Sequence, residues 1–323
     1  MFDVRPVFNV IGLLVSCLGL TMMFPMALDM SRGNGHAGVF LESALITCLT
    51  GSMMYLATRR EAARGLTLQQ TFLLTSGVWL ALPIFGALPF ALGATDSSFT
   101  DAFFEAMSGL TTTGATVISG LDYLPDGLLL WRSILQWLGG IGIIVVAMVF
   151  LPELRVGGMQ IFKSEGFDTF GKILPRATEI AAQVAWLYVG LTGACAVIYI
   201  ATGMRSFDAV LHAMTTIATG GFSTYDSSFV KFGASTEYAA VVFMCLAALP
   251  FVRYVQLING APGSLFQDSQ VRVFFIVLLV TVGFLTLVLW QGYQFSGELG
   301  FRKALFNVVS ITTGTGYASA DYS

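Results

Sequence analysis

Residues 101–116 read DAFFEAMSGLTTTGAT, residues 208–223 read DAVLHAMTTIATGGFS, and residues 303–318 read KALFNVVSITTGTGYA. Aligned without a gap, the three stretches share an alanine at the second position and a glycine twelve residues later. These glycines are Gly114, Gly221 and Gly316. A hydroxyl residue precedes each glycine by six positions, at Ser108, Thr215 and Ser310. Close packing of small residues between membrane helices explains one such stretch but not three in register, so the pattern indicates a repeated structural unit.

The composition places this repeat in a membrane. Of the 323 residues, 55% are hydrophobic and only 11% are charged, whereas a soluble domain carries about 25% charged residues. This excludes a water-soluble globule. Apolar runs long enough to cross a bilayer lie at residues 7–28, 38–57, 71–93, 128–151, 181–203, 237–258 and 272–292, so we expect seven spans. Three stretches rich in Thr, Ser and Gly are too short to cross and are expected to be re-entrant, at residues 101–113, 207–219 and 301–313.

The sequence therefore predicts an all-α membrane protein made of repeated units. Each unit consists of a span, a short re-entrant helix, a Thr/Gly turn and a second span, and two extra helices precede the first unit. Positive charge is retained on the cytoplasmic side of membrane proteins. With a cytoplasmic N-terminus, most of the 16 Lys and Arg residues fall inside, and the three re-entrant stretches enter from outside. More than half of the 19 carboxylates then also lie outside, where they would concentrate cations.

The Thr/Gly turns indicate a pathway for a monovalent cation. Glycine reaches backbone conformations closed to other residues, so such a run can direct successive carbonyl oxygens toward one axis. Rings of carbonyl oxygens replace the hydration shell of an ion, and the C-terminal end of each short helix adds the negative end of its dipole. The candidate ion ligands are Thr111, Thr112, Thr113, Gly114, Ala218, Thr219, Gly220, Gly221, Thr313, Gly314, Thr315 and Gly316.

Three polar residues occupy one equivalent position, nine residues before the shared glycine. They are Glu105, His212 and Asn307. A polar group inside a membrane helix needs a partner, and here the nearest partners are neighbouring backbone groups. We interpret the three residues as braces of the turns rather than as direct ion ligands.

These residues also carry a resemblance to a known family. Residues 101–116, 212–224 and 305–318 resemble the filter segments of the Trk/Ktr superfamily of potassium transporters, most nearly its TrkH subunits. The motifs WLGGIGI at 137–143 and PELRVGGMQ at 152–160 extend the resemblance over essentially the whole chain. The resemblance implies a multi-pass protein of the cell inner membrane, with four potassium-channel-like repeats. It also implies a homodimer and a cytosolic nucleotide-binding regulator of the TrkA type.

The resemblance assigns residues and boundaries by position. Thr112, Thr113 and Gly114 fall in the first filter segment, Gly220 and Gly221 in the second, and Thr315 and Gly316 in the third. The expected parts are an N-terminal two-helix extension at 1–66, a first pore repeat at 67–152, a cytoplasmic link with the second repeat at 153–258, and an incomplete third repeat at 259–323. On a repeat of about 100 residues, a fourth filter glycine would fall near residue ~416. We therefore expect the chain to be a fragment truncated after the third of four filter repeats, with repeat four absent.

The predicted function is potassium uptake through the Thr/Gly filter, with K⁺ as the transported ion and no covalent cofactor. A sodium-preferring or poorly selective cation transporter is the alternative, although all three copies keep glycine where less selective relatives of the family carry serine. The sequence contains no HExxH, GxSxG or P-loop motif, which argues against an enzyme. A net charge of −3 without a basic tract argues against a nucleic-acid partner. A purely structural scaffold would have no need of three turns in register.

Overall fold

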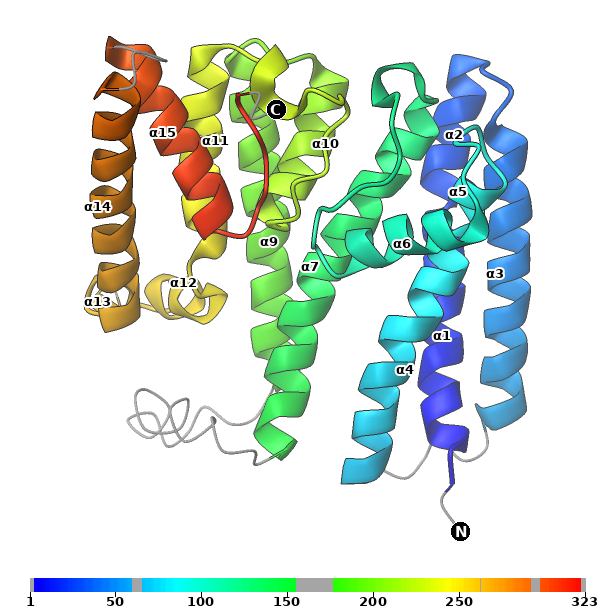
Figure 1. Ribbon diagram of the computed structural model, residues 1–323. Coiled ribbons are helices and arrows are strands. Elements are labelled where there is room, and N and C mark those ends of the chain that lie inside the picture. Colours follow the sequence, from blue (N-terminus) through cyan, green and yellow to red (C-terminus); the bar gives the residue numbers. More distant parts are fainter. Residues whose placement is uncertain (1–2, 60–65, 155–176, 262, 292–296, 321–323) are drawn as a thin grey trace. The chain divides into compact units, whose positions relative to one another are not determined.

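The structure is a computed structural model that describes residues 3–59, 66–154, 177–261, 263–291 and 297–320. Its regular secondary structure is helical throughout these ranges (Figure 1). The helices are α1 (Arg5–Thr21), α2 (Met23–Arg32), α3 (Ala37–Thr58), α4 (Leu68–Gly86), α5 (Leu88–Ala91), α6 (Phe99–Leu110), α7 (Asp126–Leu154), α9 (Ala177–Ala201), α10 (Ser206–Ile217), α11 (Ala234–Ala248), α12 (Phe251–Ile258), α13 (Gly263–Phe266), α14 (Ser269–Gln291) and α15 (Gly297–Thr312). The predicted all-α class is confirmed. The cytoplasmic link expected at the start of the second repeat lies largely outside the described residues, which exclude 155–176.

The chain divides into two compact units. The first comprises Met1–Thr111 with Ala115–Gly139, and the second comprises Thr112–Gly114 with Gly140–Ser323. The boundary runs through α7, between Gly139 and Gly140. All three Thr/Gly turns, from residue 112 onward in the first copy, belong to the second unit.

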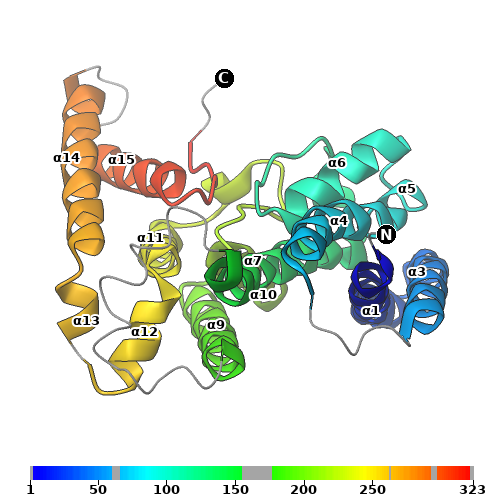
Figure 2. The ribbon, with the colours of Figure 1, turned by 90° about the horizontal axis from the view of Figure 1, so that it is seen from below.

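In the first unit, α1 packs against α3 at backbone distance, with α4 beside α1 (Figures 1 and 2). A Cβ added at Gly12 would lie 2.6 Å from the Tyr55 nitrogen, and one at Gly51 would lie 2.6 Å from the Ser16 nitrogen. No side chain fits at either position without moving the backbone of the opposite helix. Glycine thus lets two apolar helices meet closely where lipid gives no hydrophobic drive for them to associate.

Five helical segments are long and apolar enough to span a membrane among the described residues, or six if one bent pair counts as a span. They match six of the expected runs, as Arg5–Arg32, Ala37–Thr58, Gln69–Ala91, Ile180–Ala201, Ser269–Gln291 and the bent pair α11 and α12. The seventh expected run, 128–151, corresponds to the 29-residue helix α7. A chain with several such segments is a multi-pass membrane protein.

The run expected as one span at 237–258 is apolar enough to cross, but its helix is broken in the middle. Helix α11 ends at Ala248 and α12 begins at Phe251, with an angle of 86° between them. The cause is Pro250, which cannot donate the backbone hydrogen bond of a helix and disfavours helical geometry in the residue before it. Leu249 is accordingly extended, with φ −76° and ψ 149°. Hydropathy alone cannot detect this break because both sides of it are apolar.

An ion pair ties α12 to the start of α14. The Arg253 Nε lies 2.7 Å from the Asp268 Oδ2, and the Asp268 Oδ1 accepts the backbone N–H of Gln270 at 2.8 Å. Burial by itself raises the pKa of Asp268, but the hydrogen bonds from Gln270 and Arg253 and the positive charge of Arg253 outweigh it, so the pKa is lowered. The ionised carboxylate is therefore the form that holds the two helices together.

This ion pair makes part of the stability acid-sensitive. Because the folded-state pKa of Asp268 is lowered, its contribution is present above the unfolded pKa of about 3.9 and is lost as pH falls through the folded value. We expect thermal unfolding of the purified full-length protein between pH 6 and about pH 3 to lose less stability in Asp268→Asn than in the parent protein. An Asp101→Asn variant, at an exposed position, serves as the control. Identical acid dependence in the parent and in Asp268→Asn would contradict this assignment.

Candidate functional site

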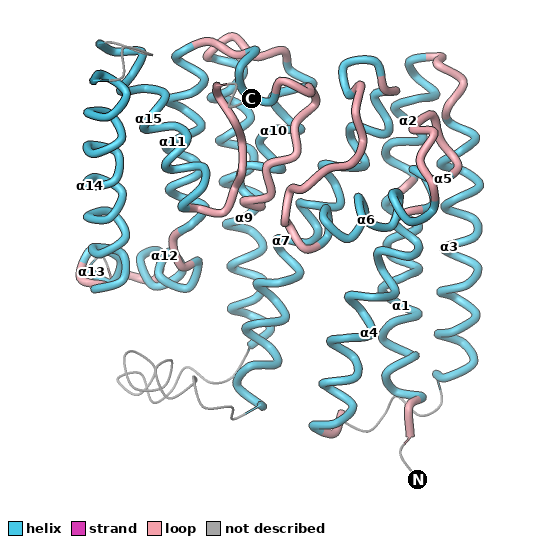
Figure 3. The backbone as a smooth tube through the Cα atoms, viewed as in Figure 1, coloured by secondary structure: helices cyan, strands magenta, loops and turns pink. Residues whose placement is uncertain are grey.

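Each predicted re-entrant stretch consists of a short helix followed by a turn. The stretches at 101–113, 207–219 and 301–313 largely coincide with α6, α10 and α15, which are 12, 12 and 16 residues long and begin one to four residues earlier. After α10 and after α15 the chain reverses and runs back toward the end from which the helix came (Figures 1 and 3). Ser98 caps the start of α6 by accepting the Asp101 N–H at 3.2 Å. The repeat found in the sequence is thus a repeat of local structure as well.

The backbone of the three turns follows one pattern. Each turn has two residues with positive φ, separated by one residue, and they occupy the same two positions of the repeat. These pairs are Thr112 (54°) with Gly114 (80°), Thr219 (50°) with Gly221 (76°), and Gly314 (78°) with Gly316 (85°). When the sign of φ alternates, neighbouring peptide planes can turn their carbonyl oxygens to the same side, which a regular strand does not allow. The shared glycine is therefore needed for its conformation.

Two of these positions carry threonine, for which positive φ is strained. A β-branched residue in this region is a real outlier and costs about 1–3 kcal/mol. Thr112 and Thr219 both adopt it, at the same position of the repeat. Strain of this kind persists only where the surrounding structure enforces it, and it concentrates at functional sites.

The second unit brings the three turns together at backbone distance. A Cβ on Gly114 would overlap the carbonyl oxygen of Gly220 and would lie 3.7 Å from that of Thr315. A Cβ on Gly221 would overlap the Thr315 carbonyl oxygen and would lie 3.3 Å from the Gly316 carbonyl carbon. The first turn therefore meets the second, and the second meets the third, through glycine faces and carbonyl oxygens.

The threonine hydroxyls largely serve the turns themselves. Thr111 donates its hydroxyl to the Met107 carbonyl at 2.8 Å, within its own helix. Thr313 shares a hydrogen bond of 2.8 Å with the Thr315 hydroxyl, and Thr315 is fully buried. Of the candidate ligands, these three are thus held by neighbours in the same copy. The backbone carbonyls are the groups that the three turns present to one another.

In the first unit, Glu105 braces the segment that follows the first turn. Its carboxylate accepts hydrogen bonds from the Thr116 hydroxyl at 2.9 Å and from the Val117 N–H at 3.1 Å. Arg132 on α7 donates to the same carboxylate at 2.8 Å, and both side chains of the pair are buried. Buried charges are stable only when they are paired and hydrogen-bonded, and this ion pair meets both conditions.

In the second unit, His212 and Asn307 do the same for the other two copies. His212 Nδ1 lies 2.8 Å from the Asp208 carbonyl oxygen on its own helix, and its Nε2 lies 3.0 Å from the Ser223 hydroxyl. Asn307 donates to the Ser319 hydroxyl at 3.1 Å and accepts the Ser319 N–H at 3.2 Å. All three residues thus hydrogen-bond the segment after their own turn, as expected of braces, although several of their partners are side chains rather than backbone groups.

Tyr317 joins the third turn to α10. It directly follows the shared glycine, and its hydroxyl contacts the Thr215 hydroxyl, the Thr216 hydroxyl at 3.2 Å and the His212 carbonyl at 3.1 Å. Its ring packs on Phe229, with centroids 4.5 Å apart. Sequence reasoning did not assign Tyr317 a role. The aromatic residues Phe222 and Tyr317 after the second and third glycines were the available signal.

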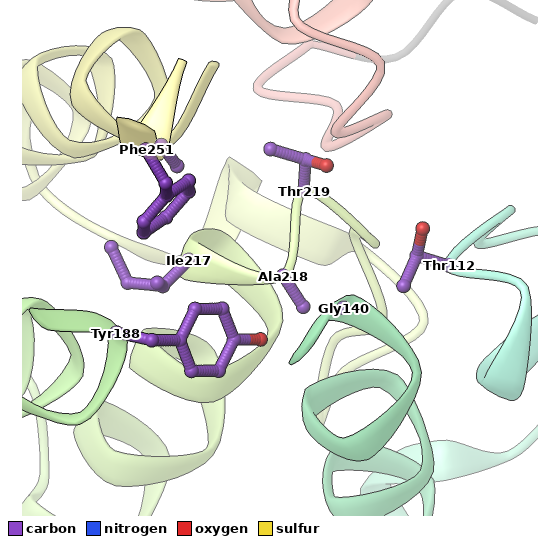
Figure 4. Close-up of a pocket in the computed structure, with 8 residues that line it drawn as sticks. Thr112, Gly140, Tyr188, Ile217, Ala218, Thr219 and Phe251 are labelled. Atoms are coloured by element: carbon purple, nitrogen blue, oxygen red, sulfur yellow. The ribbon is translucent and has the colours of Figure 1, made fainter. Parts of the chain in front are cut away.

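A cavity of about 180 Å³ lies in the second unit, beside Thr112 of the first turn and Thr219 of the second. Figure 4 shows Tyr188, Ile217 and Phe251 on one side of it and Thr112 and Thr219 on the other. Ile217 is the last residue of α10, so the negative end of that helix dipole faces the cavity. Its lining is mainly apolar, and Thr112, Thr219 and Tyr188 contribute the hydroxyl groups.

Comparison with known proteins identifies relatives along the whole chain. The family described as "TrkH: Cation transport protein" matches residues 36–323. The chain is 39% identical to the Trk system potassium uptake protein TrkH of Halomonas elongata, over 99% of this chain and 67% of that protein. It is 38% identical to the Trk system potassium uptake protein TrkI of the same organism, over 98% of this chain and 65% of that protein. The chain thus spans about two thirds of the length of these relatives.

A solved structure agrees with these sequence matches. The crystal structure of the potassium transporter TrkH from Vibrio parahaemolyticus superimposes with a TM-score of 0.89 at 34% identity, covering 99% of this chain and 66% of that one. The family and these relatives are transporters rather than enzymes. With a matching fold and a family match over most of its length, this chain belongs to the TrkH family of cation transport proteins.

Proposed function

We propose that this chain forms most of the pore of a potassium uptake system, with the Thr/Gly turns as its selectivity filter. The observation that carries the proposal is the shared backbone pattern of three turns, with positive φ at equivalent positions and carbonyl oxygens at the faces where the turns meet. Carbonyl oxygens arranged around one axis are the ligands that replace the water shell of potassium. The relatives are named potassium uptake proteins, which supports potassium as the ion.

The finer organisation follows from the same proposal. The extension at 1–66 precedes pore repeats at 67–152, 153–258 and 259–323, and α6, α10 and α15 act as pore helices. The complete protein works as a homodimer in the inner membrane, with its N-terminus in the cytoplasm and a TrkA-like nucleotide-binding regulator bound on that side. The relatives' description as parts of a Trk system supports a multi-component assembly.

Ion flux into liposomes containing the purified full-length protein tests this function. We expect uptake of ⁸⁶Rb⁺ that unlabelled potassium suppresses at concentrations about tenfold lower than sodium does. Sodium competing as well as potassium would favour the alternative, a sodium-preferring or poorly selective cation transporter. Absence of any monovalent cation flux above that of empty liposomes would contradict the proposal.

A further inference from the structure

The N-terminal extension meets α7 at a buried carboxylate. Asp29 lies near the end of α2 and is fully buried. Its Oδ1 accepts the backbone N–H of Gly127 at 2.8 Å and the Asn34 side-chain amide at 2.7 Å. The His36 N–H donates to the Asn34 Oδ1 at 3.0 Å, which fixes the orientation of that amide. A short network thus holds the carboxylate against the first turn of α7, within the first unit.

This carboxylate supplies a cap that the local sequence lacks. The first N–H groups of any helix have no partner inside the helix and are usually capped by a Ser, Thr, Asp or Asn just before it. The residue before α7 is Pro125, whose side chain carries no acceptor. Asp29, 98 residues earlier in the chain, provides the acceptor instead. Its negative charge also faces the positive end of the dipole of a 29-residue helix.

The fit between the two residues depends on glycine at position 127. A Cβ there would overlap the Asp29 Oδ2 and would lie 2.8 Å from its Oδ1. Within the described part of the chain, Oδ2 has no hydrogen-bond partner and is buried. The position of the carboxylate is therefore set by the bonds of Oδ1 and by the space that Gly127 leaves.

The position of α7 in turn sets the start of the first turn. Trp131 on α7 donates its indole N–H to the Gly86 carbonyl at 2.9 Å, and Arg132 pairs with Glu105 on α6. At Gly139, a Cβ would overlap the carbonyl oxygen of Leu110, the last residue of α6. A shift of α7 along its axis would therefore move the end of α6, from which the residues of the first turn continue.

We propose that Asp29 is a positioning residue for the ion pathway: from the N-terminal extension it caps α7 and so holds the first Thr/Gly turn in place. This inference rests on the proposed transport function. It gives the two-helix extension a task in transport beyond that of a membrane anchor, and it names a buried contact through which the extension performs it, beside the partly exposed ion pair of Arg32 with Asp126.

A double-mutant cycle between Asp29 and Gly127 tests the contact independently of transport. We expect Asp29→Ala to lower the melting temperature of the purified full-length protein, because α7 loses its cap. We expect Gly127→Ala to lower it as well, because the new methyl displaces the carboxylate. In the double variant the methyl has room, so its melting temperature should equal or exceed that of Asp29→Ala. Simple additivity of the two losses would overturn the contact. Gly38→Ala, at a position with open space around the glycine, is the matched control.

Rubidium uptake by the same variants tests the positioning role. Asp29→Asn keeps the Oδ1 acceptor, so its KM should stay within about twofold of the parent, whereas Asp29→Ala should raise the KM by about threefold to fivefold. A purely structural cap would change the amount of folded protein and leave the KM alone. Coupling in the melting cycle with an equal KM in all variants would overturn the positioning role and leave the transport function intact. Absence of rubidium uptake by the parent protein would instead overturn the transport function, and with it the positioning role, while the melting cycle would still decide the contact.

Discussion

Alanine at position 221 is expected to reduce ion flux to background while the protein remains folded. The added Cβ overlaps the carbonyl oxygen of Thr315 in the neighbouring turn, and the positive φ of 76° disfavours any side chain by about 1–2 kcal/mol. Either the second or the third turn must move, and the carbonyl oxygens between them move with it. Uptake of ⁸⁶Rb⁺ into liposomes with equal amounts of parent and variant measures the loss, and size-exclusion chromatography checks the fold.

Gly120 offers a control that separates the cost of a positive φ from the effect of a clash between two turns. It also has a positive φ, of 74°, but no atom lies within 4 Å of the position of its Cβ. We expect Gly120→Ala to cost about 1–2 kcal/mol of stability from its conformation alone and to transport rubidium at the parent rate. A Gly221→Ala variant that transports at the rate of Gly120→Ala would contradict the importance of the contact between the turns.

Removal of Glu105 is expected to have the largest effect on stability. Glu105→Ala leaves the buried guanidinium of Arg132 without its carboxylate, and loss of one partner of a buried pair costs about 3–5 kcal/mol. The Thr116 and Val117 bonds to the same carboxylate are lost as well, so the segment after the first turn loosens. Thermal unfolding of the purified full-length protein measures the change.

Two further variants show whether the buried charge is the cause. The double variant Glu105→Met/Arg132→Met removes both charges and should recover much of the lost stability, because two apolar side chains replace the pair. Glu298→Ala removes an acid that is 58% exposed and pairs with Arg302, and should change the melting temperature far less than Glu105→Ala does. A double variant less stable than Glu105→Ala would show that packing of these side chains, rather than the unpaired charge, dominates.

The sequence predicts the repeat well because its signal is local. A fixed distance between alanine and glycine in three copies locates α6, α10 and α15 and the turns that follow them, including the glycines that adopt positive φ. The same alignment places Glu105, His212 and Asn307 at one position, and all three brace their turns as expected. Threonine at positive φ could not be predicted, because its own preference opposes that conformation and only the surrounding structure enforces it.

Contacts between segments that are far apart in the chain cannot be predicted from one sequence alone. Arg132 falls inside an apolar run, which indicates a buried partner, but nothing in the chain says that the partner is Glu105. The cap that Asp29 provides to α7 joins residues 98 positions apart and follows no local capping pattern. Pro250 is visible in the sequence as a cause of the bend, yet proline also occurs inside a helix without ending it at once, as Pro83 does in α4. In each case the tertiary environment decides between outcomes that the local sequence permits.

The most direct test of the filter is to locate the ion. Crystals of the full-length protein grown in rubidium would show the ion by its anomalous scattering. We predict a peak among the backbone carbonyl oxygens of residues 112–113, 219–220 and 314–315, and its loss in Gly221→Ala. If the protein transports rubidium but the crystals show rubidium only at other positions, with none between the three turns, the account is contradicted.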